Sequence, residues 1–147
     1  MISVADRDNL VRQRADRRCE YCRMHQSLQG GTFHIEHIQP KSRGGDSELA
    51  NLALACPSCN LHKSDRMESA DPLTGETVRL FVPRHAKWRE HFDWDEFEII
   101  GLTPIGRATV AALKFNEPRH IRIRQAEKMF DLFPPDDVGG ESDPNGN

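Results

Sequence analysis

The sequence predicts a small α+β domain that is held together by a bound metal ion. Four cysteines form two Cys-x-x-Cys pairs, Cys19 with Cys22 and Cys56 with Cys59. A strand-like segment, residues 32–38, lies between the pairs, and the second pair opens a helix-like segment. Hydrophobic residues make up only 37% of the 147 residues. A core of that modest size often needs a staple, and a metal ion is one kind.

The spacing of the cysteines is typical of a tetrathiolate metal site. Both sulfurs of a Cys-x-x-Cys turn can reach one ion, and two such turns complete a tetrahedron. Four thiolates leave no open position for water, so a zinc ion bound there would be structural rather than catalytic. Two alternatives stay open at this stage. They are four unligated or redox-active thiols, and an iron ion in the same set of ligands.

The segment before the first pair is predicted to be a helix over residues 4–18. Ser3 is a suitable N-cap, and Val4, Leu10 and Val11 are spaced to share one face. The other side carries five arginines: Arg7, Arg12, Arg14, Arg17 and Arg18. These arginines form either a phosphate-facing strip or an ordinary solvated helix face.

Glycine and proline separate the elements around the second pair. A glycine pair and Pro40 enclose the strand predicted at residues 32–38, which is rich in β-branched and aromatic residues. Residues 41–46 contain another glycine pair and are predicted to form a loop. Pro57 suits the first turn of a helix that would continue to about residue 66.

Residues 67–133 are predicted to add a strand-and-helix extension. Thr103 and Pro104 give a strong helix start, with Thr as the cap and Pro at the first position. The expected elements are strands at residues 77–82 and 97–100 and helices at residues 104–116 and 118–132. Aromatic residues between positions 88 and 94 either stack on nucleic-acid bases or build a small core. Residues 134–147, which are rich in Pro, Gly, Asp and Asn, are expected to be disordered.

Charge and hydropathy limit the classes of protein that fit this chain. The net charge of −3 argues against a protein that coats nucleic acid non-specifically, although residues 1–66 carry 10 basic and 8 acidic side chains. A local patch can still bind phosphate, and ordinary solvated surface explains this asymmetry equally well. No apolar run approaches the ~20 residues of a membrane span, and the start lacks a secretory pattern. We therefore expect a cytoplasmic protein whose cysteines bind metal.

Glu36 and His37 lie side by side between the two cysteine pairs. In a regular strand they would point to opposite faces, but the twist near a strand end can bring both to one cleft. A carboxylate suits a hard cation such as Mg2+, and a neutral imidazole can take a proton from water. Phosphodiester hydrolysis needs both a base and a cation. By themselves the two residues are weak support, because surface Glu-His pairs are common.

The order of motifs resembles the HNH endonuclease family, the ββα-metal or His-Me finger nucleases. The matching text is the first Cys-x-x-Cys, HIEHIQPKSRGGD at residues 34–46, ELANL at residues 48–52 and ACPSCNLHKS at residues 55–64. The resemblance covers residues 16–66, about a third of the chain. It implies a zinc-stapled ββα-metal core, which the basic helix predicted above precedes and the predicted extension follows.

The resemblance also implies roles for individual residues. His37 would be the general base that activates water, and Asn51 would fix the loop and orient that base. Glu36, where the family usually has Asp, and Asn60 would bind one catalytic Mg2+ or Mn2+, separate from the zinc. Three basic residues are candidate phosphate contacts: Lys41, Arg43 and Lys63. For each of the three, a solvated side chain is the alternative.

The sequence therefore predicts a metal-dependent endonuclease that hydrolyses DNA phosphodiester bonds. The expected organisation is the N-terminal helix plus nuclease core at residues 1–66, the extension packed on it at 67–133, and the tail at 134–147. The rival prediction is a non-catalytic zinc module that binds nucleic acid or protein. RNA stays open as a substrate, as do the target site and the oligomeric state, and no membrane partner is expected.

Overall fold

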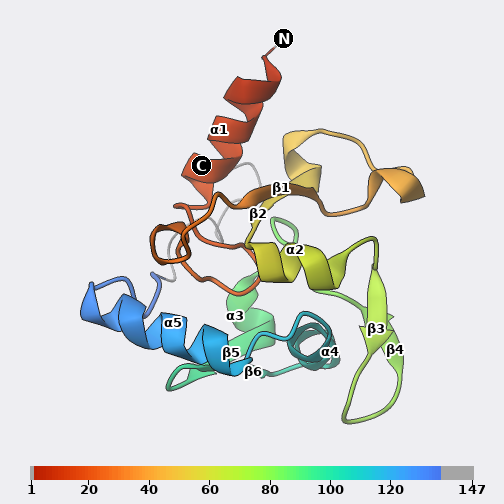
Figure 1. Cartoon of the computed structure of the whole chain (residues 1–147). Helices are drawn as coiled ribbons and strands as arrows, with labels where there is room; N and C mark the ends of the chain where they lie inside the picture. The colour runs from red at the N-terminus through yellow and green to blue at the C-terminus, as the bar shows by residue number, and fades with distance from the viewer. Residues whose placement is uncertain (1, 137–147) are drawn as a thin grey trace.

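The computed structural model describes residues 2–136, and the prediction of an α+β fold is confirmed. Within these residues, three two-stranded antiparallel sheets alternate with five α-helices (Figure 1). The helices are α1 (Val4–Arg14), α2 (Pro57–Lys63), α3 (Trp88–His91), α4 (Pro104–Ala112) and α5 (Pro118–Met129). The strands are β1 (His34–His37), β2 (Leu52–Ala55), β3 (Glu68–Ala70), β4 (Thr77–Arg79), β5 (Phe92–Asp95) and β6 (Glu98–Gly101). In this part of the chain, every helix is too short or too polar to cross a membrane.

The β1–β2 hairpin and α2 form the centre of the N-terminal half. Strand β1 pairs antiparallel with β2, so that Glu36 lies opposite Ala53 and His37 opposite Leu52. All four residues of β2 are buried, as expected of a short apolar strand. Helix α2 follows β2 directly because Cys56 caps it and Pro57 occupies its first position.

Helix α1 extends away from the rest of the protein in Figure 1, with the N-terminus at its far end. Ser3 caps it as predicted, but the helix ends at Arg14 rather than near residue 18. The chain then takes a left-handed conformation at Asp16 and Arg17, where φ is 54° and 56°. Consecutive left-handed residues cannot continue a right-handed helix.

The arginines of this N-terminal segment mainly serve the fold. Arg12 donates to Phe33 O at 3.5 Å, and Arg14 donates to Leu52 O. Arg18 donates to two main-chain carbonyls, and it is buried. These contacts connect the segment to the β1–β2 hairpin and to Leu132, near the C-terminal end of the described residues. They favour a structural role over a continuous phosphate-binding strip.

The aromatic side chains of the C-terminal half pack against one another. The Trp88 and Phe92 rings are 5.0 Å apart, and Phe92 also meets Phe81 at 5.2 Å and Phe115 at 5.7 Å. All four side chains are buried, so they are not free to stack on bases. The segment from residue 88 to 94 therefore builds a core, folding as α3 and the start of β5.

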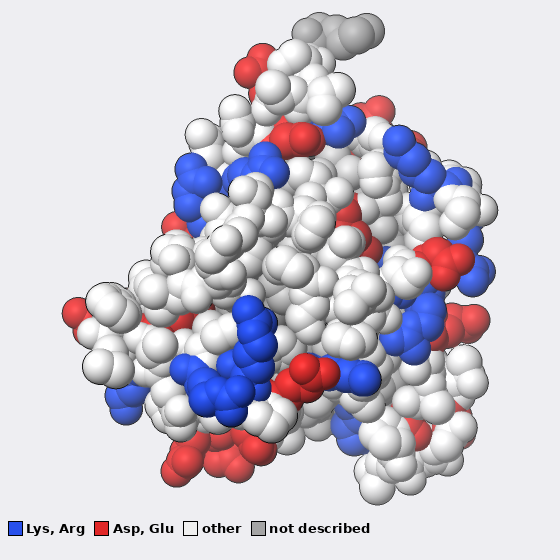
Figure 2. All heavy atoms as spheres, viewed as in Figure 1, with Lys and Arg blue, Asp and Glu red and all other residues white. Residues whose placement is uncertain are grey.

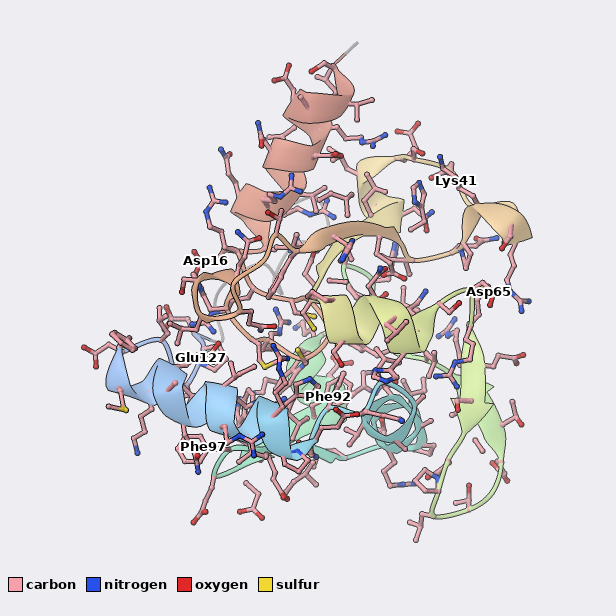
Figure 3. All side chains as sticks on the ribbon, in the orientation of Figure 1. Asp16, Lys41, Asp65, Phe92, Phe97 and Glu127 are labelled. Carbon is pink, nitrogen blue, oxygen red and sulfur yellow. The ribbon has the colours of Figure 1, made fainter. Side chains whose placement is uncertain are left out.

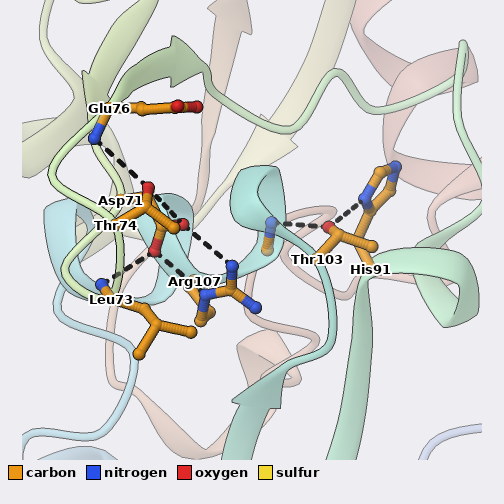
Figure 4. Close-up of polar contacts among 8 residues, drawn as sticks. Asp71, Leu73, Thr74, Glu76, His91, Thr103 and Arg107 are labelled. Carbon is orange, nitrogen blue, oxygen red and sulfur yellow. Dashed lines mark hydrogen bonds and ion pairs between the residues drawn. The ribbon is translucent and has the colours of Figure 1, made fainter.

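The hairpin of β3 and β4 is fixed to α4 by one buried carboxylate. Asp71 accepts two hydrogen bonds from the Arg107 guanidinium, at 2.9 and 2.8 Å, and also accepts from Leu73 N and Thr74 Oγ1 (Figure 4). The Arg107 contact is the main reason that the pKa of Asp71 lies far below its usual value. Strand β3 was not predicted, because it is short, polar and partly exposed. Its pairing with β4 follows from this turn.

The predicted helices of the extension are present with shorter limits. Helix α4 starts at Pro104 with Thr103 as its cap, as predicted, and ends at Ala112 rather than near residue 116. Helix α5 starts at Pro118 and ends at Met129. Most of the predicted disordered tail, residues 137–147, lies outside the described residues.

Buried polar contacts join the extension to the N-terminal half. Glu20, which lies between the first two cysteines, accepts from Arg84 Nε at 2.7 Å and from Leu54 N at 2.8 Å. Both side chains of the Glu20–Arg84 ion pair are buried. Trp88 Nε1 donates to Tyr21 O at 2.8 Å nearby. The cysteine-bearing turn is thus supported by residues that follow it far along the chain.

Replacing Arg84 with methionine is expected to destabilise the protein by about 3–5 kcal/mol, because Glu20 would be left as an unpaired buried charge. Urea denaturation of the zinc-loaded protein measures the change in the free energy of unfolding. Arg79→Met is the matched control, since Arg79 is exposed on β4, and its effect should stay within about 0.5 kcal/mol. Equal stability of the two variants would contradict a stabilising role for the Glu20–Arg84 pair.

Candidate metal centre and nuclease site

The four cysteines converge on one buried point, as predicted. Their sulfurs all lie within 4.8 Å of one another, and Cys22 Sγ is 3.7 Å from Cys56 Sγ. A tetrahedron with Zn–S bonds of about 2.3 Å has S···S edges of about 3.8 Å. In each pair, a main-chain N–H points at the first sulfur: Cys22 N at Cys19 and Cys59 N at Cys56. The cluster therefore fits a structural zinc site.

Burial opposes ionisation of the cysteine side chains. Burial raises the pKa of Cys22 and Cys59 well above the ordinary value of a thiol. Burial acts in the same direction on Cys19, but hydrogen bonds from the other three cysteines outweigh it and lower the pKa of Cys19. A bound cation would offset the charge of thiolates in this interior.

Arg124 of α5 adds positive charge on the side of the extension. It is buried and donates to Phe97 O at 2.8 Å and Phe115 O at 2.7 Å. Burial lowers the pKa of Arg124, whereas the charges of nearby cysteines oppose that effect. Its guanidinium thus partly offsets the negative charge of a tetrathiolate site.

His37 lies at the end of β1 with its ring partly open to solvent. Its Nε2 is 3.0 Å from Ser47 Oγ, on the loop between β1 and β2. Partial burial lowers the pKa of His37 below 6.5, and the positive charges of Lys41 and Arg7 lower it further. At neutral pH the ring is therefore mainly uncharged, which is the form that accepts a proton.

Glu36 points to the opposite face of the strand and is buried beneath α2. Its Oε1 is 2.6 Å from Lys63 Nζ, and its Oε2 accepts from Tyr21 Oη at 2.6 Å. Burial raises the pKa of Glu36, while Lys63 and Tyr21 oppose the shift. The regular pairing of β1 with β2 thus keeps Glu36 and His37 on different sides, as strand alternation requires.

Asn51 connects the two ends of the loop between β1 and β2. Its Oδ1 accepts from Gln39 N at 2.8 Å, and its Nδ2 donates to Gln39 O at 3.1 Å and Asp46 O at 2.7 Å. His37 and its contact Ser47 flank the segment that these bonds close. This is the geometry that a loop-fixing residue requires, and the part of Asn51 in catalysis stays a prediction.

The remaining candidate residues for metal binding and phosphate contact lie on α2 and on the loop between β1 and β2. Asn60 is half-buried on α2, and Lys63 lies three residues further on the same helix face. Arg43 donates to Asp65 O at 2.9 Å, while Lys41 is exposed on the loop (Figure 3). On the face seen in Figure 2, basic groups are interspersed with acidic ones and form no continuous basic area. Of these candidate phosphate contacts, Lys41 is therefore accessible from solvent, whereas Lys63 is buried.

Two contacts in this region were not predicted from the sequence. Tyr21 lies within the first Cys-x-x-Cys pair, and its hydroxyl group reaches Glu36. Ser47 lies in the polar loop and meets His37. Neither contact has a local sequence signal, because the partners are distant in the chain: Tyr21 is 15 residues from Glu36, and Ser47 is 10 residues from His37.

Residues 19–66 match the family described as HNH endonuclease. This segment is similar to the HNH endonucleases. It contains both cysteine pairs, the β1–β2 hairpin and α2, so the predicted relationship to the HNH endonucleases is confirmed. No curated protein and no solved structure matches the chain significantly.

The catalytic cation of HNH enzymes would take its oxygen ligands here from Glu36 and Asn60. A carboxylate and an amide carbonyl suit Mg2+ or Mn2+, which also retain several waters. The donor atoms therefore fit the ion chemically. Among residues 2–136, the four cysteines are the only group of three or more His, Cys, Asp or Glu side chains close enough to share an ion. Water would have to complete the coordination of the second ion.

Proposed function

We propose that the protein is a metal-dependent endonuclease that hydrolyses DNA phosphodiester bonds. The observation that carries the proposal is the state of His37 within the HNH domain. Its imidazole is partly exposed at the end of β1, partial burial and nearby positive charge lower its pKa, and the adjoining loop is closed by Asn51. An uncharged ring at a solvent-accessible strand end can remove a proton from an attacking water.

The other residues have supporting roles in this proposal. Asn51 positions His37 by holding the loop ends together. Glu36 and Asn60 would hold Mg2+ or Mn2+, which when bound neutralises charge on the phosphate and the leaving oxygen. Lys41, on the exposed loop, is available to a DNA phosphate. The cysteines hold a structural zinc that fixes the turn of Tyr21 and the start of α2.

A plasmid-nicking assay tests the proposal. Zinc-loaded protein is incubated with supercoiled DNA and increasing Mg2+ or Mn2+, beside the variant His37→Ala. The expected result is conversion to nicked or linear DNA by the wild type only. Absence of cleavage with either metal, or equal cleavage by both proteins, would exclude this nuclease mechanism. The same assay with a labelled RNA strand tests RNA as a substrate.

Replacing Asn51 with alanine is expected to lower the cleavage rate by about 10–100-fold, because a catalytic group that moves by about 1 Å loses up to that factor. The three hydrogen bonds that close the loop would be lost. Initial rates at saturating metal measure the effect. Asn51→Asp keeps the acceptor for Gln39 N and should retain more activity than alanine. Full activity of Asn51→Ala would contradict the loop-fixing role.

A non-catalytic zinc module remains the second candidate, and the burial of Glu36 favours it. Both oxygens of this carboxylate have partners within the protein, so Glu36 is not presented to solvent as a free ligand. A binding module would retain its affinity for nucleic acid or protein after His37→Ala, and it would cut no DNA. Fluorescence anisotropy with a labelled duplex, recorded beside the nicking assay, separates the two functions.

A further inference from the structure

Lys63 makes an ion pair at the carboxylate where the proposed function needs a metal ion. Its Nζ is 2.6 Å from Glu36 Oε1 and donates to Ile38 O at 2.9 Å. The side chain of Lys63 is 3% exposed and that of Glu36 is 6% exposed. Lys63 is thus a buried ammonium at the end of α2, held by Glu36 and the Ile38 carbonyl rather than by solvent.

The Glu36–Lys63 pair is electrically complete as it stands. One ammonium neutralises one carboxylate, and the hydroxyl group of Tyr21 satisfies the other oxygen. A divalent cation at Glu36 would lie beside the ammonium, and the repulsion between the two charges is strong in a poorly solvated site. Metal and Lys63 therefore compete for one carboxylate.

We propose that Lys63 is an intramolecular substitute for the divalent cation: it holds Glu36 in the zinc-loaded protein without Mg2+ or Mn2+, and it leaves this carboxylate when either ion binds. This inference rests on the proposed function, because it assumes that Glu36 is a metal ligand. Its consequence is that Glu36 is not an unpaired buried charge in the zinc-loaded protein before Mg2+ or Mn2+ binds. The metal affinity is correspondingly reduced, since each binding event must break the ion pair.

The surroundings of Lys63 give its side chain room to move. It lines a cavity of about 340 Å³ together with Gln39, Met67, Arg79, Val82 and His85. The Lys63 stem is flexible and α2 ends at this residue, so the ammonium can leave Glu36 while the helix stays in place. Arg79 is exposed at this cavity, where water screens its charge.

Binding of Mn2+ to the zinc-loaded protein tests the exchange without any measurement of cleavage. Electron paramagnetic resonance of free Mn2+ gives the dissociation constant for the wild type, Lys63→Met and the control Lys87→Met. Lys87 is an exposed lysine before α3. Removing the competing ammonium should tighten binding by roughly tenfold or more, while Lys87→Met should match the wild type. Unchanged or weaker binding by a folded Lys63→Met would overturn the proposal.

A second measurement uses the unaltered protein, so it does not depend on how a variant folds. The side-chain NMR signals of Lys63, assigned through bonds from its backbone, are followed as diamagnetic Mg2+ is added. Departure from Glu36 should shift these signals in step with binding, whereas those of Lys87 should stay. Signals of Lys63 that do not move at saturating Mg2+ would show that the pair persists, and the proposal would fail.

The variant Glu36→Gln separates this proposal from the proposed function. Glu36→Gln should abolish Mn2+ binding both by itself and when it is combined with Lys63→Met. Retained Mn2+ binding would exclude Glu36 as the ligand. If the wild type cleaves DNA while Lys63→Met binds Mn2+ no more tightly, only the exchange is wrong. If Lys63→Met binds more tightly and the wild type cuts nothing, the exchange holds and the nuclease proposal is wrong.

Discussion

Removing the metal from the four-cysteine cluster is expected to unfold the protein. Zinc bound to four thiolates contributes about 10–16 kcal/mol of apparent binding energy in small zinc domains, whereas a domain is stable by only about 5–15 kcal/mol. The cluster also lies in the main core, where all four cysteines are buried among the residues of β2 and the aromatic side chains. Loss of the metal would leave four buried thiols without a common partner.

Cys56→Ser is the variant that tests this, because Cys56 is both a proposed ligand and the cap of α2. Ser58→Ala, between Cys56 and Cys59, is the matched control in the same turn. The far-ultraviolet circular dichroism signal and the thermal transition should be lost in Cys56→Ser and after treatment with a zinc chelator. They should persist in Ser58→Ala. A cooperative transition that survives complete removal of metal would show that the core is sufficient alone.

Metal analysis of the purified protein decides which ion the cysteines hold. Zinc gives a colourless protein with one equivalent of metal, and tetrathiolate iron gives visible absorption bands. The sulfur distances suit a tetrahedral ion of either kind, and the absorption spectrum with the metal content distinguishes the two.

The features that could be predicted from the sequence are those set by neighbouring residues. The Cys-x-x-Cys turns, the Pro at the start of α2 and the Thr103–Pro104 start of α4 each depend on a few adjacent positions. The start of α1 could likewise be predicted from its cap, Ser3, whereas the predicted end near residue 18 was four residues too late. The left-handed turn at Asp16 and Arg17 that stops it has no local sequence signal such as glycine.

The environment of Glu36 could not be predicted, because distant parts of the chain determine it. Tyr21 and Lys63 come from a cysteine turn and from the end of α2, and only the folded hairpin brings them to one carboxylate. Strand β3 is a similar case, since its turn depends on Arg107 in α4. Sequence motifs thus identified which residues to consider at the site, and tertiary packing determined which of them are exposed.

Replacing His37 with alanine is expected to lower the cleavage rate by about 10²–10⁴-fold, the usual contribution of a positioned general base. The expected loss is large because His37 is the partly exposed imidazole at the end of β1, next to the Asn51-closed loop, and Glu36 beside it faces the interior. Initial rates of plasmid nicking at saturating Mg2+ measure the effect. His34→Ala is the matched control, since His34 is exposed on the same strand, and it should keep most of the activity.

The pH dependence of the rate distinguishes a base from a residue that only shapes the loop. Partial burial, with the charges of Lys41 and Arg7, lowers the pKa of His37 below 6.5. The active form is the unprotonated ring, so the rate should be level at and above neutral pH and fall as the pH drops through this lowered pKa. In Lys41→Gln one repulsive charge is absent, the pKa of His37 rises, and the fall should begin at a higher pH. In the proposed mechanism, the charge of Lys41 affects the pH profile only through the ring of His37. The same pH profile in the wild type and in Lys41→Gln would therefore mean that another group limits the rate.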